Sequence, residues 1–231
     1  MARQERAIRT RQSILTAAAE VFDEVGYEGA TISEILQRSG VTKGALYFHF
    51  SSKDDLVQGV LEGQIAAMPE VPPHELKLQE AVDRGLMLAH LLRHEPLLRG
   101  SVRLAVEQGS TKEGLHPRMP YQAWLDVSLR LFEDAKAAGE LLPHIDATRT
   151  AQVFVGSFTG VQLMSQALSG REDVEARMAD LYSYLMSAIA VPGVLVRLDI
   201  QPDRGERVHK EAVRLNEEQR ERQPEQAGTT A

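Results

Sequence analysis

The stretch from Thr31 to Phe50, TISEILQRSGVTKGALYFHF, carries polar side chains whose types and spacing suit contacts with duplex DNA. Lys43 can donate hydrogen bonds to a guanine edge or a phosphate, and Gly44 beside it lets a backbone come close to a groove. Hydroxyl, imidazole and ammonium groups at helix ends can bind phosphates and fix the register of a protein on DNA. The residues of this kind are Thr31, Ser33, Thr42, Tyr47, His49 and Lys53.

Each of these residues also has a purely structural interpretation. A lysine taken alone is commonly a solvated surface residue. Threonine is a preferred residue type at the start of a helix, where its hydroxyl caps a free backbone amide. Thr31 can serve both purposes, because the amides at a helix start also attract phosphate. The spacing of the whole segment, more than any single residue in it, favours DNA binding.

Two short helices joined by a tight turn must position these groups. Thr31 can cap the first helix in a capping box with Glu34, Gly40 ends that helix, and Thr42 can cap the second. The remaining apolar residues are expected to pack inward, and they are Ile32, Ile35, Leu36, Val41, Ala45, Leu46 and Phe48. This is the pattern of a helix-turn-helix whose second helix docks in a major groove.

Two further helices complete an N-terminal head. One is predicted from about Glu5 to Val25, where apolar residues recur at helical spacing before Gly26. The other opens at a capping box of Ser52 with Asp55. Its apolar face is interrupted by Gln64, a polar residue that suits either ligand binding or an internal hydrogen bond.

The charge of the chain is unevenly distributed. The net charge is −7 at pH 7, which repels DNA phosphates at long range. Residues 1–12 nevertheless hold four arginines against one glutamate. Arg3, Arg6 and Arg9 can form an arm that follows the DNA backbone or enters a minor groove. A frayed, solvated terminus is the other interpretation, and the sequence leaves both open.

The rest of the chain also predicts helices. Met68 to Pro73 holds three prolines in six residues and marks a junction. Beyond it, helices are expected near 75–94, 97–108, 120–138, 147–169 and 172–190. The fold class is therefore all-α, with residues 1–52 as the DNA-binding head, joined by the helix that opens at Ser52 to a larger C-terminal helical domain at 53–200. The polar residues 201–231 are expected to form a disordered tail.

The last two long helices are candidates for a dimer interface. Val174, Met178, Leu181, Leu185 and Ala188 step by four and three residues, as in a coiled-coil seam. Gly156 and Gly160 on the preceding helix permit close helix approach. On periodicity alone, an intramolecular core explains the stripe equally well.

The motifs GVTKGALYFHFSSKDDL and TISEIL resemble the DNA-binding head of the tetracycline-repressor (TetR) family. Further segments resemble the gamma-butyrolactone autoregulator receptors, a subgroup of that family. These segments are RGSVRLAVEQG, YQAWLDV, GELLPH, VGSFTGVQLMSQ and AIAVPGVLVRLD. The resemblance implies an all-α homodimer that represses transcription at a near-palindromic operator and is released by a lactone-type or butenolide ligand. A pseudo-receptor that answers to an antibiotic or biosynthetic intermediate, or that does not respond to autoregulators, is the alternative.

Four residues are candidates for ligand contact. The resemblance implies that Trp124, the single tryptophan, stacks on a small lactone ring. Without the resemblance, simple packing of the indole in the core would be the structural interpretation. Thr159 and Gln162 lie three residues apart on an apolar helix and can hydrogen bond a lactone or hydroxyl oxygen. For these two, and for Gln64, internal hydrogen bonds are an equally good explanation.

Composition and motifs argue against an enzyme. The chain has no cysteine, which excludes disulfides, zinc thiolates and thiol nucleophiles. His90 and His94 have metal-binding spacing, but no third ligand is evident, so neither a metal nor another cofactor is expected. Ser157 between Gly156 and Gly160 lies in a helical pattern, not at a strand-to-helix turn. The charged N-terminus has no apolar signal core and no apolar run reaches 18 residues, so a cytoplasmic protein is expected.

Overall fold

Helices dominate the part of the chain that the computed structural model describes, which is residues 2–108 and 118–226. Side chains are described there except at residues 2–3, 64–67, 108, 118–120 and 219–226. Within these ranges the strand-like pairing is a single bridge between Leu141 and Ala190. No helix in them is both long enough and apolar enough to cross a lipid bilayer. The predicted all-α fold is confirmed.

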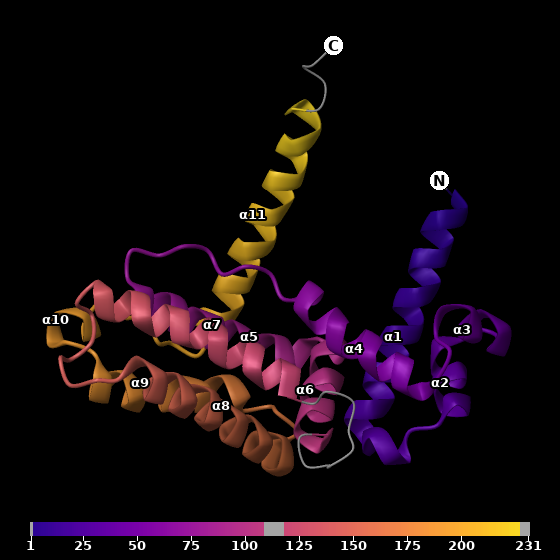
Figure 1. Cartoon of the computed structure of the whole chain (residues 1–231), viewed down its shortest axis with the longest axis horizontal. Helices are drawn as coiled ribbons and strands as arrows, with labels where there is room; N and C mark the ends of the chain where they lie inside the picture. The colour runs from indigo at the N-terminus through magenta and orange to yellow at the C-terminus, as the bar shows by residue number, and fades with distance from the viewer. Residues whose placement is uncertain (1, 109–117, 227–231) are drawn as a thin grey trace. The chain divides into compact units, whose positions relative to one another are not determined.

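The chain divides into two compact units, the first made of residues 1–68 and 94–122 and the second of residues 69–93 and 123–231. The first holds α1 (Ala2–Gly29), α2 (Ile32–Ser39), α3 (Lys43–His49), α4 (Lys53–Ala67) and α6 (Pro96–Gln108). The second holds most of α5 (Lys77–His94) and α7 (Arg118–Ala137), with α8 (Ala147–Ser169), α9 (Val174–Ile189), α10 (Pro192–Leu195) and α11 (Arg204–Gln226) (Figure 1). Each long helix expected from the sequence has a counterpart.

The core of the first unit forms around α1. Its apolar face packs on all the other helices of the unit, because residues at helical spacing point to one side. The fully buried members are Ile14, Leu15, Val21 and Phe22 of α1, Ile35 of α2, Leu46 of α3, Leu56 and Val60 of α4 and Leu104 of α6. At Gly100 of α6, a Cβ would lie 2.3 Å from the carbonyl oxygen of Ala19, so α6 and α1 touch backbone to backbone. The first unit thus contains α6, which is distant from the head in sequence.

A break in α1 falls at Gly26, where the sequence predicts the helix end. Gly26 has φ 73° and ψ −179°, a conformation that favours glycine, and one further turn follows it to Gly29. The backbone amide of Tyr27, freed by this break, donates to the carboxylate of Glu107 on α6 over 3.0 Å. The break therefore gains a hydrogen-bond partner from a helix 80 residues away.

The second unit is built around the neighbouring helices α8 and α9, which pack on one another through buried aromatic residues. Gly170, in the left-handed conformation with φ 60°, ends α8. Asp173 then accepts hydrogen bonds from the hydroxyls of Ser165 (2.6 Å) and Ser169 (2.7 Å) and from Arg177 (2.6 Å). These bonds to the charged form lower the pKa of Asp173 to about 2, the Ser165 bond contributing most.

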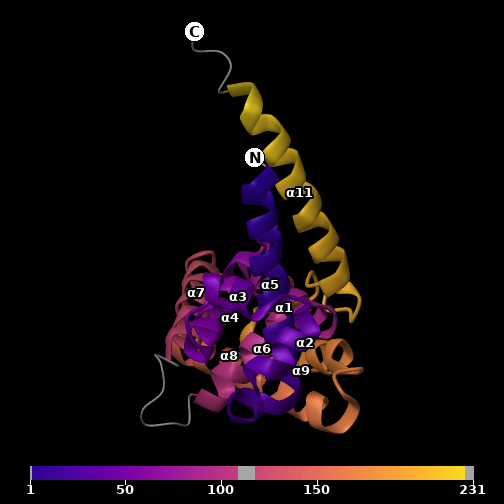
Figure 2. The ribbon, with the colours of Figure 1, turned by 90° about the vertical axis from the view of Figure 1, so that its right-hand side faces the viewer.

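The expected disordered tail is wrong for most of its length, because residues 204–226 form α11. Arg204 makes a two-pronged bond to the buried carboxylate of Asp83, with distances of 2.8 and 2.6 Å. Gly205 lets α11 approach the carbonyl oxygen of Leu86, and Val208 and Ala212 are buried one turn apart. Farther along, α11 extends away from the rest of its unit (Figures 1 and 2). The polar composition of this segment gave no sign of these contacts. Residues 227–231 lie outside the described ranges.

Candidate DNA-binding and ligand-binding sites

The helix-turn-helix of α2 and α3 is fixed by the predicted caps. The Thr31 hydroxyl accepts a hydrogen bond from the Glu34 amide over 3.2 Å, and the Thr42 hydroxyl accepts from the Ala45 amide over 3.2 Å. Gly40, with φ 67°, ends α2 in the left-handed conformation and donates to the Leu36 carbonyl. The two predicted N-caps and the helix end at Gly40 are confirmed. Among the described residues, no bond from the Thr31 amide to the Glu34 side chain completes the predicted capping box.

The outer face of α3 carries most of the predicted DNA contacts. Lys43 and Tyr47 are exposed and lie one turn apart, with the Lys43 ammonium 5.9 Å from the centre of the Tyr47 ring. Gly44 is exposed as well, and a Cβ built there would meet no described atom within 4 Å. Thr31, Ser33 and Thr42 are exposed at the helix starts, and His49 is half-buried. The outer face of α3 is therefore accessible to solvent and presents an ammonium group, a phenol and a bare backbone.

Phe48 contradicts the expectation that it packs inward. Its side chain is 80% exposed, whereas Leu46 is fully buried. Two residues along a helix turn a side chain by about 200°, so Phe48 faces away from Leu46 and shares the outer face with Gly44. A simple apolar-inside rule missed this residue, and counting helical angles from Leu46 would have found it.

Lys53 at the start of α4 lies over an aromatic ring. Its ammonium is 4.4 Å from the centre of the Tyr27 ring, and the Tyr27 hydroxyl donates to the carboxylate of Asp54. That hydrogen bond, with burial adding to it, raises the pKa of Tyr27 to about 12. Tyr27 therefore positions Lys53, and its own amide ties it to α6.

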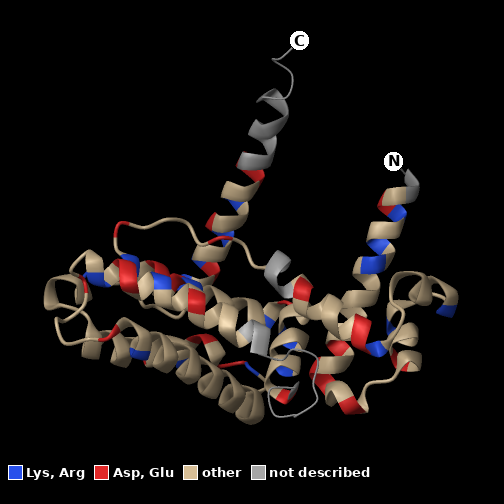
Figure 3. Ribbon diagram, in the orientation of Figure 1, with Lys and Arg blue, Asp and Glu red and all other residues tan. Residues whose placement is uncertain are grey.

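The basic N-terminal residues belong to the helix α1, so their backbone is not that of an extended arm. Arg6 and Arg9 are exposed there, and Arg9 lies 3.9 Å from Glu5. Figure 3 shows the basic residues along these first turns, which extend beyond α2 and α3. The side chain of Arg3 lies outside the described set, so its predicted role stays a prediction.

In the second unit, the buried face of α8 contains an unpaired amide. Gln162 is 1% exposed, and neither its carbonyl nor its amino group has a hydrogen-bond partner among the described residues. The buried residues on the same face are Ala151, Phe154, Val155, Phe158 and Ser165. Burying an unpaired amide in apolar surroundings is unfavourable by about 1–3 kcal/mol. Gln162 thus offers a donor and an acceptor inside the unit.

Tyr182 on α9 is a second buried polar group, which the sequence analysis did not single out. Its hydroxyl is buried and has no partner within the described part of the chain. Burial raises the pKa of this phenol, which is therefore a neutral donor. The available space comes from Gly85 on α5, where a Cβ would lie 2.0 Å from the Tyr182 oxygen. A glycine inside a helix was the signal that could have drawn attention to it.

The other predicted ligand residues are less informative. Trp124 on α7 and Thr159 on α8 are both half-buried. The Thr159 hydroxyl donates to the Val155 carbonyl over 2.9 Å, so its proton is used within α8. The side chain of Gln64 lies outside the described set. Among the three candidates whose side chains are described, Gln162 is the one with a donor and an acceptor that are both buried and unpaired.

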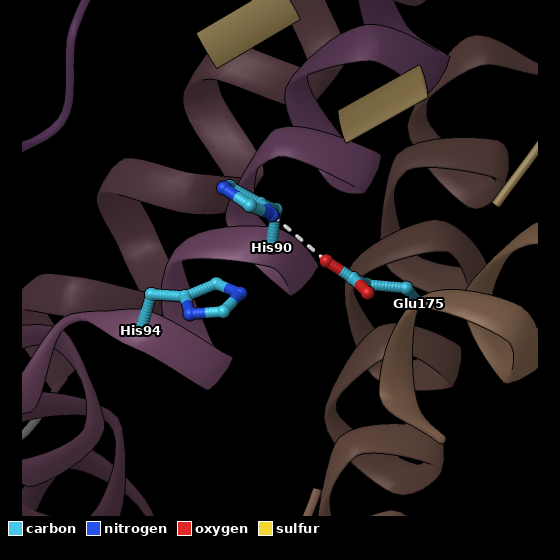
Figure 4. A group of neighbouring side chains, drawn as sticks. All are labelled: His90, His94 and Glu175. Carbon is cyan, nitrogen blue, oxygen red and sulfur yellow. Dashed lines mark hydrogen bonds and ion pairs between the residues drawn. The ribbon is translucent and has the colours of Figure 1, made fainter. Parts of the chain in front are cut away.

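His90 belongs to a polar cluster with Glu175 and Arg93 that the sequence did not reveal. Its Nδ1 lies 2.8 Å from one carboxylate oxygen of Glu175 on α9 (Figure 4). Arg93 donates to the other oxygen over 3.1 Å. His94 follows one turn later on α5, so the structure brings a third candidate ligand, Glu175, to the two histidines, with all ligand atoms within 4.8 Å of one another. Both Glu175 oxygens already bind side chains of α5. We therefore interpret the cluster as a structural link between α5 and α9, and we assign no metal to it.

The outward face of α8 and α9 is apolar. Its exposed residues are Val153, Leu163, Met164 and Leu168 on α8 and Tyr184 on α9. Gly156 and Gly160 have no described atom within 4 Å of a built Cβ, so another backbone could approach them closely. Val174 and Met178 from the predicted seam are fully buried in the protomer, so that part of the stripe is intramolecular core. A face of this kind marks a protein interface.

Comparison with known proteins identifies similar regulators. The chain matches bacterial regulatory proteins of the tetR family over residues 14–60 and a tetracyclin repressor-like C-terminal domain over residues 78–192. It is 43% identical to the A-factor receptor protein of Streptomyces griseus, over 86% of this chain and 70% of that protein.

Two solved structures are similar as well. TylP, a TetR regulator from Streptomyces fradiae, has 51% sequence identity and a TM-score of 0.80 over 90% of this chain and 99% of its own. A gamma-butyrolactone receptor described as ArpA-like has 27% identity and a TM-score of 0.67 over 89% of this chain and 98% of its own.

Proposed function

Because the chain belongs to the TetR family, whose members are ligand-responsive repressors that bind operator DNA as dimers, we propose that a small gamma-butyrolactone-type or butenolide molecule releases it from its operator. The protein is a transcriptional regulator and not an enzyme. The proposal assigns DNA binding to residues 1–52, ligand binding and dimerisation to residues 53–200, and a cytoplasmic location to the protein. The relatives that bear the names A-factor receptor and gamma-butyrolactone receptor support this ligand class.

The unpaired amide of Gln162 is the observation that carries the ligand assignment. A lactone has an apolar ring and a carbonyl acceptor, and many such molecules also bear a hydroxyl donor. Gln162 can donate to the carbonyl and accept from the hydroxyl, in apolar surroundings where such bonds are strong. Tyr182 can supply a second donor, and Trp124, Thr159 and Gln64 complete the proposed set of ligand contacts.

DNA binding is assigned to the exposed face of the helix-turn-helix. Lys43 and Gly44 face the major groove, while Thr31, Ser33, Thr42, Tyr47, His49, Lys53, Arg3 and Arg6 hold the phosphates. In the dimer, two such faces must lie about 34–36 Å apart, or a multiple of this, to enter grooves on one side of the duplex. Lys43→Ala should weaken operator binding by about 1–3 kcal/mol. The matched control, Lys210→Ala on exposed α11, should leave binding unchanged.

To reverse operator occupancy from 99:1 to 1:99, the ligand must favour the released state by about 5.5 kcal/mol. The test titrates gamma-butyrolactones and butenolides of varied side chain into the protein–operator complex, with gel shift and the fluorescence of the single Trp124 as readouts. Gln162→Leu should keep operator affinity and lose release by the lactone, whereas the exposed Gln201→Leu should respond normally.

Two results would contradict the proposal. Release only by an antibiotic or biosynthetic intermediate would place the protein among the pseudo-receptors. Normal lactone response in Gln162→Leu would move the ligand away from the buried face of α8.

A further inference from the structure

Phe48 is the most exposed aromatic side chain on the helix-turn-helix. It is 80% exposed, against 45% for Tyr47 beside it. Phe48 and Gly44 form one i,i+4 pair on α3, and Tyr47 and Lys43 form the next. The outer face of the recognition helix therefore has a cationic start and an apolar end.

The Phe48 ring has an ordered neighbour. It stands edge-on to the His49 ring, with centroids 5.0 Å apart and planes at 85°. His49 in turn lies 6.4 Å from the ring of Phe50, which is buried in the core. A run of three neighbouring rings thus connects the exposed phenyl to the core.

The surface next to Phe48 is open. Gly44, one turn earlier, has no side chain, and a Cβ built there would meet no described atom within 4 Å. A base edge can therefore approach the helix alongside the phenyl ring. Because phenylalanine has neither a hydrogen-bond donor nor an acceptor, it cannot read the polar groups of a base pair.

One apolar group projects into the major groove of B-DNA, the C5-methyl group of thymine. We propose that Phe48 reads a thymine methyl in each half-site of the operator, and so sets sequence specificity at the end of α3 opposite to Lys43. A phosphate would gain little from a phenyl ring, whereas a methyl group removes both itself and the ring from water. The residue that reads polar base edges and the residue that reads a methyl group then share one helix face.

The test uses an operator selected by the full-length protein from random duplexes. Each thymine of a half-site is replaced in turn by deoxyuridine, which lacks only the methyl group, and affinity is measured at constant salt. At one position the replacement should weaken binding of the unchanged protein by about 10-fold. Phe48→Ala changes both protomers of the homodimer, so it should weaken binding to the thymine operator by about the product of the losses at the two half-sites.

The coupling between the two changes decides the proposal. Phe48→Ala should bind the thymine and uracil operators equally at that one position, while Phe48→Leu should keep part of the preference. The exposed Val213→Ala on α11 should keep all of it. Unchanged affinity of Phe48→Ala would overturn the proposal. So would a loss of affinity that is independent of every thymine methyl, since that result assigns Phe48 to the DNA backbone.

Discussion

The phenol ring of Tyr182 lies parallel to the phenyl ring of Phe154, with planes 7° and centroids 4.8 Å apart. Phe154 also meets Phe132 edge-on over 5.4 Å, so α7, α8 and α9 share one aromatic cluster. The Tyr182 hydroxyl at the edge of that cluster is buried and has no partner among the described residues. The stacking holds this hydroxyl in place although no hydrogen bond does.

Tyr182→Phe should stabilise the free protein and weaken its response to ligand. The change keeps the stacked ring and removes an unpaired buried hydroxyl, which should raise the free energy of unfolding by about 1–2 kcal/mol. Urea denaturation and operator release by lactone measure the two effects. The exposed Tyr184→Phe should change neither stability nor response. A less stable Tyr182→Phe would mean that the hydroxyl has a partner in the free protein.

Met164→Glu should break the homodimer. Met164 is 45% exposed on the apolar face of α8, one turn beyond Gly160. In a two-fold symmetric interface the change places two unpaired carboxylates in an apolar contact, which strongly disfavours association. Sedimentation velocity should show monomers, while Val213→Glu on α11 should remain dimeric. If Met164→Glu also sedimented as a dimer, the interface would not include this face.

Arg204→Ala should destabilise the second unit. Asp83 is 2% exposed and Arg204 neutralises it, so the loss of the guanidinium leaves a buried charge. Removing one partner of a buried pair lowers the free energy of unfolding by about 3–5 kcal/mol. Arg207→Ala, which removes exposed ion pairs with Asp199 and Asp203, should lower it by no more than about 1 kcal/mol. Equal effects in urea denaturation would show that Arg204 does not anchor α11.

Acid should remove the contribution of Asp173 to stability. Its pKa is lowered from 3.8 to about 2 by the Ser165, Ser169 and Arg177 bonds. A depressed pKa in the folded state gives stability that is fully present above about pH 4 and is lost as the pH falls toward 2. Asp173→Asn should therefore melt below the unchanged protein at pH 6, and the gap should narrow by pH 2. A gap independent of pH would contradict this, and Asp180→Asn on the exposed side of α9 serves as the control.

The sequence predicted the long helices and their caps well because both depend on local chemistry. Thr31, Gly40 and Thr42 act within three or four residues of their own positions, so their spacing carries the information. The apolar face of α1 follows from periodicity in the same way. The predicted sites on α3 also follow from local order, which places Lys43, Gly44 and Tyr47 on one face.

Features set by distant contacts could not be predicted. The Arg204–Asp83 pair joins residues 121 positions apart, so nothing local in the polar segment signals a helix there. Gln162 was singled out as a polar residue on an apolar helix, but only the fold shows that both of its polar groups are unpaired. Tyr182 was not singled out from the sequence, because the position of its hydroxyl beside Gly85 depends on a contact with another helix.

The backbone contact between Gly100 and Ala19 bears on how chimeric regulators are assembled. Any larger residue at position 100 would run into the α1 carbonyl, so the surface of α1 is matched to this particular α6. A DNA-binding module cut after α4 would lose α6. The core residues of the first unit that pack against Leu104 of α6 would then be exposed. The portable module is therefore discontinuous, and swaps between regulators of this kind should exchange residues 1–68 together with 94–122.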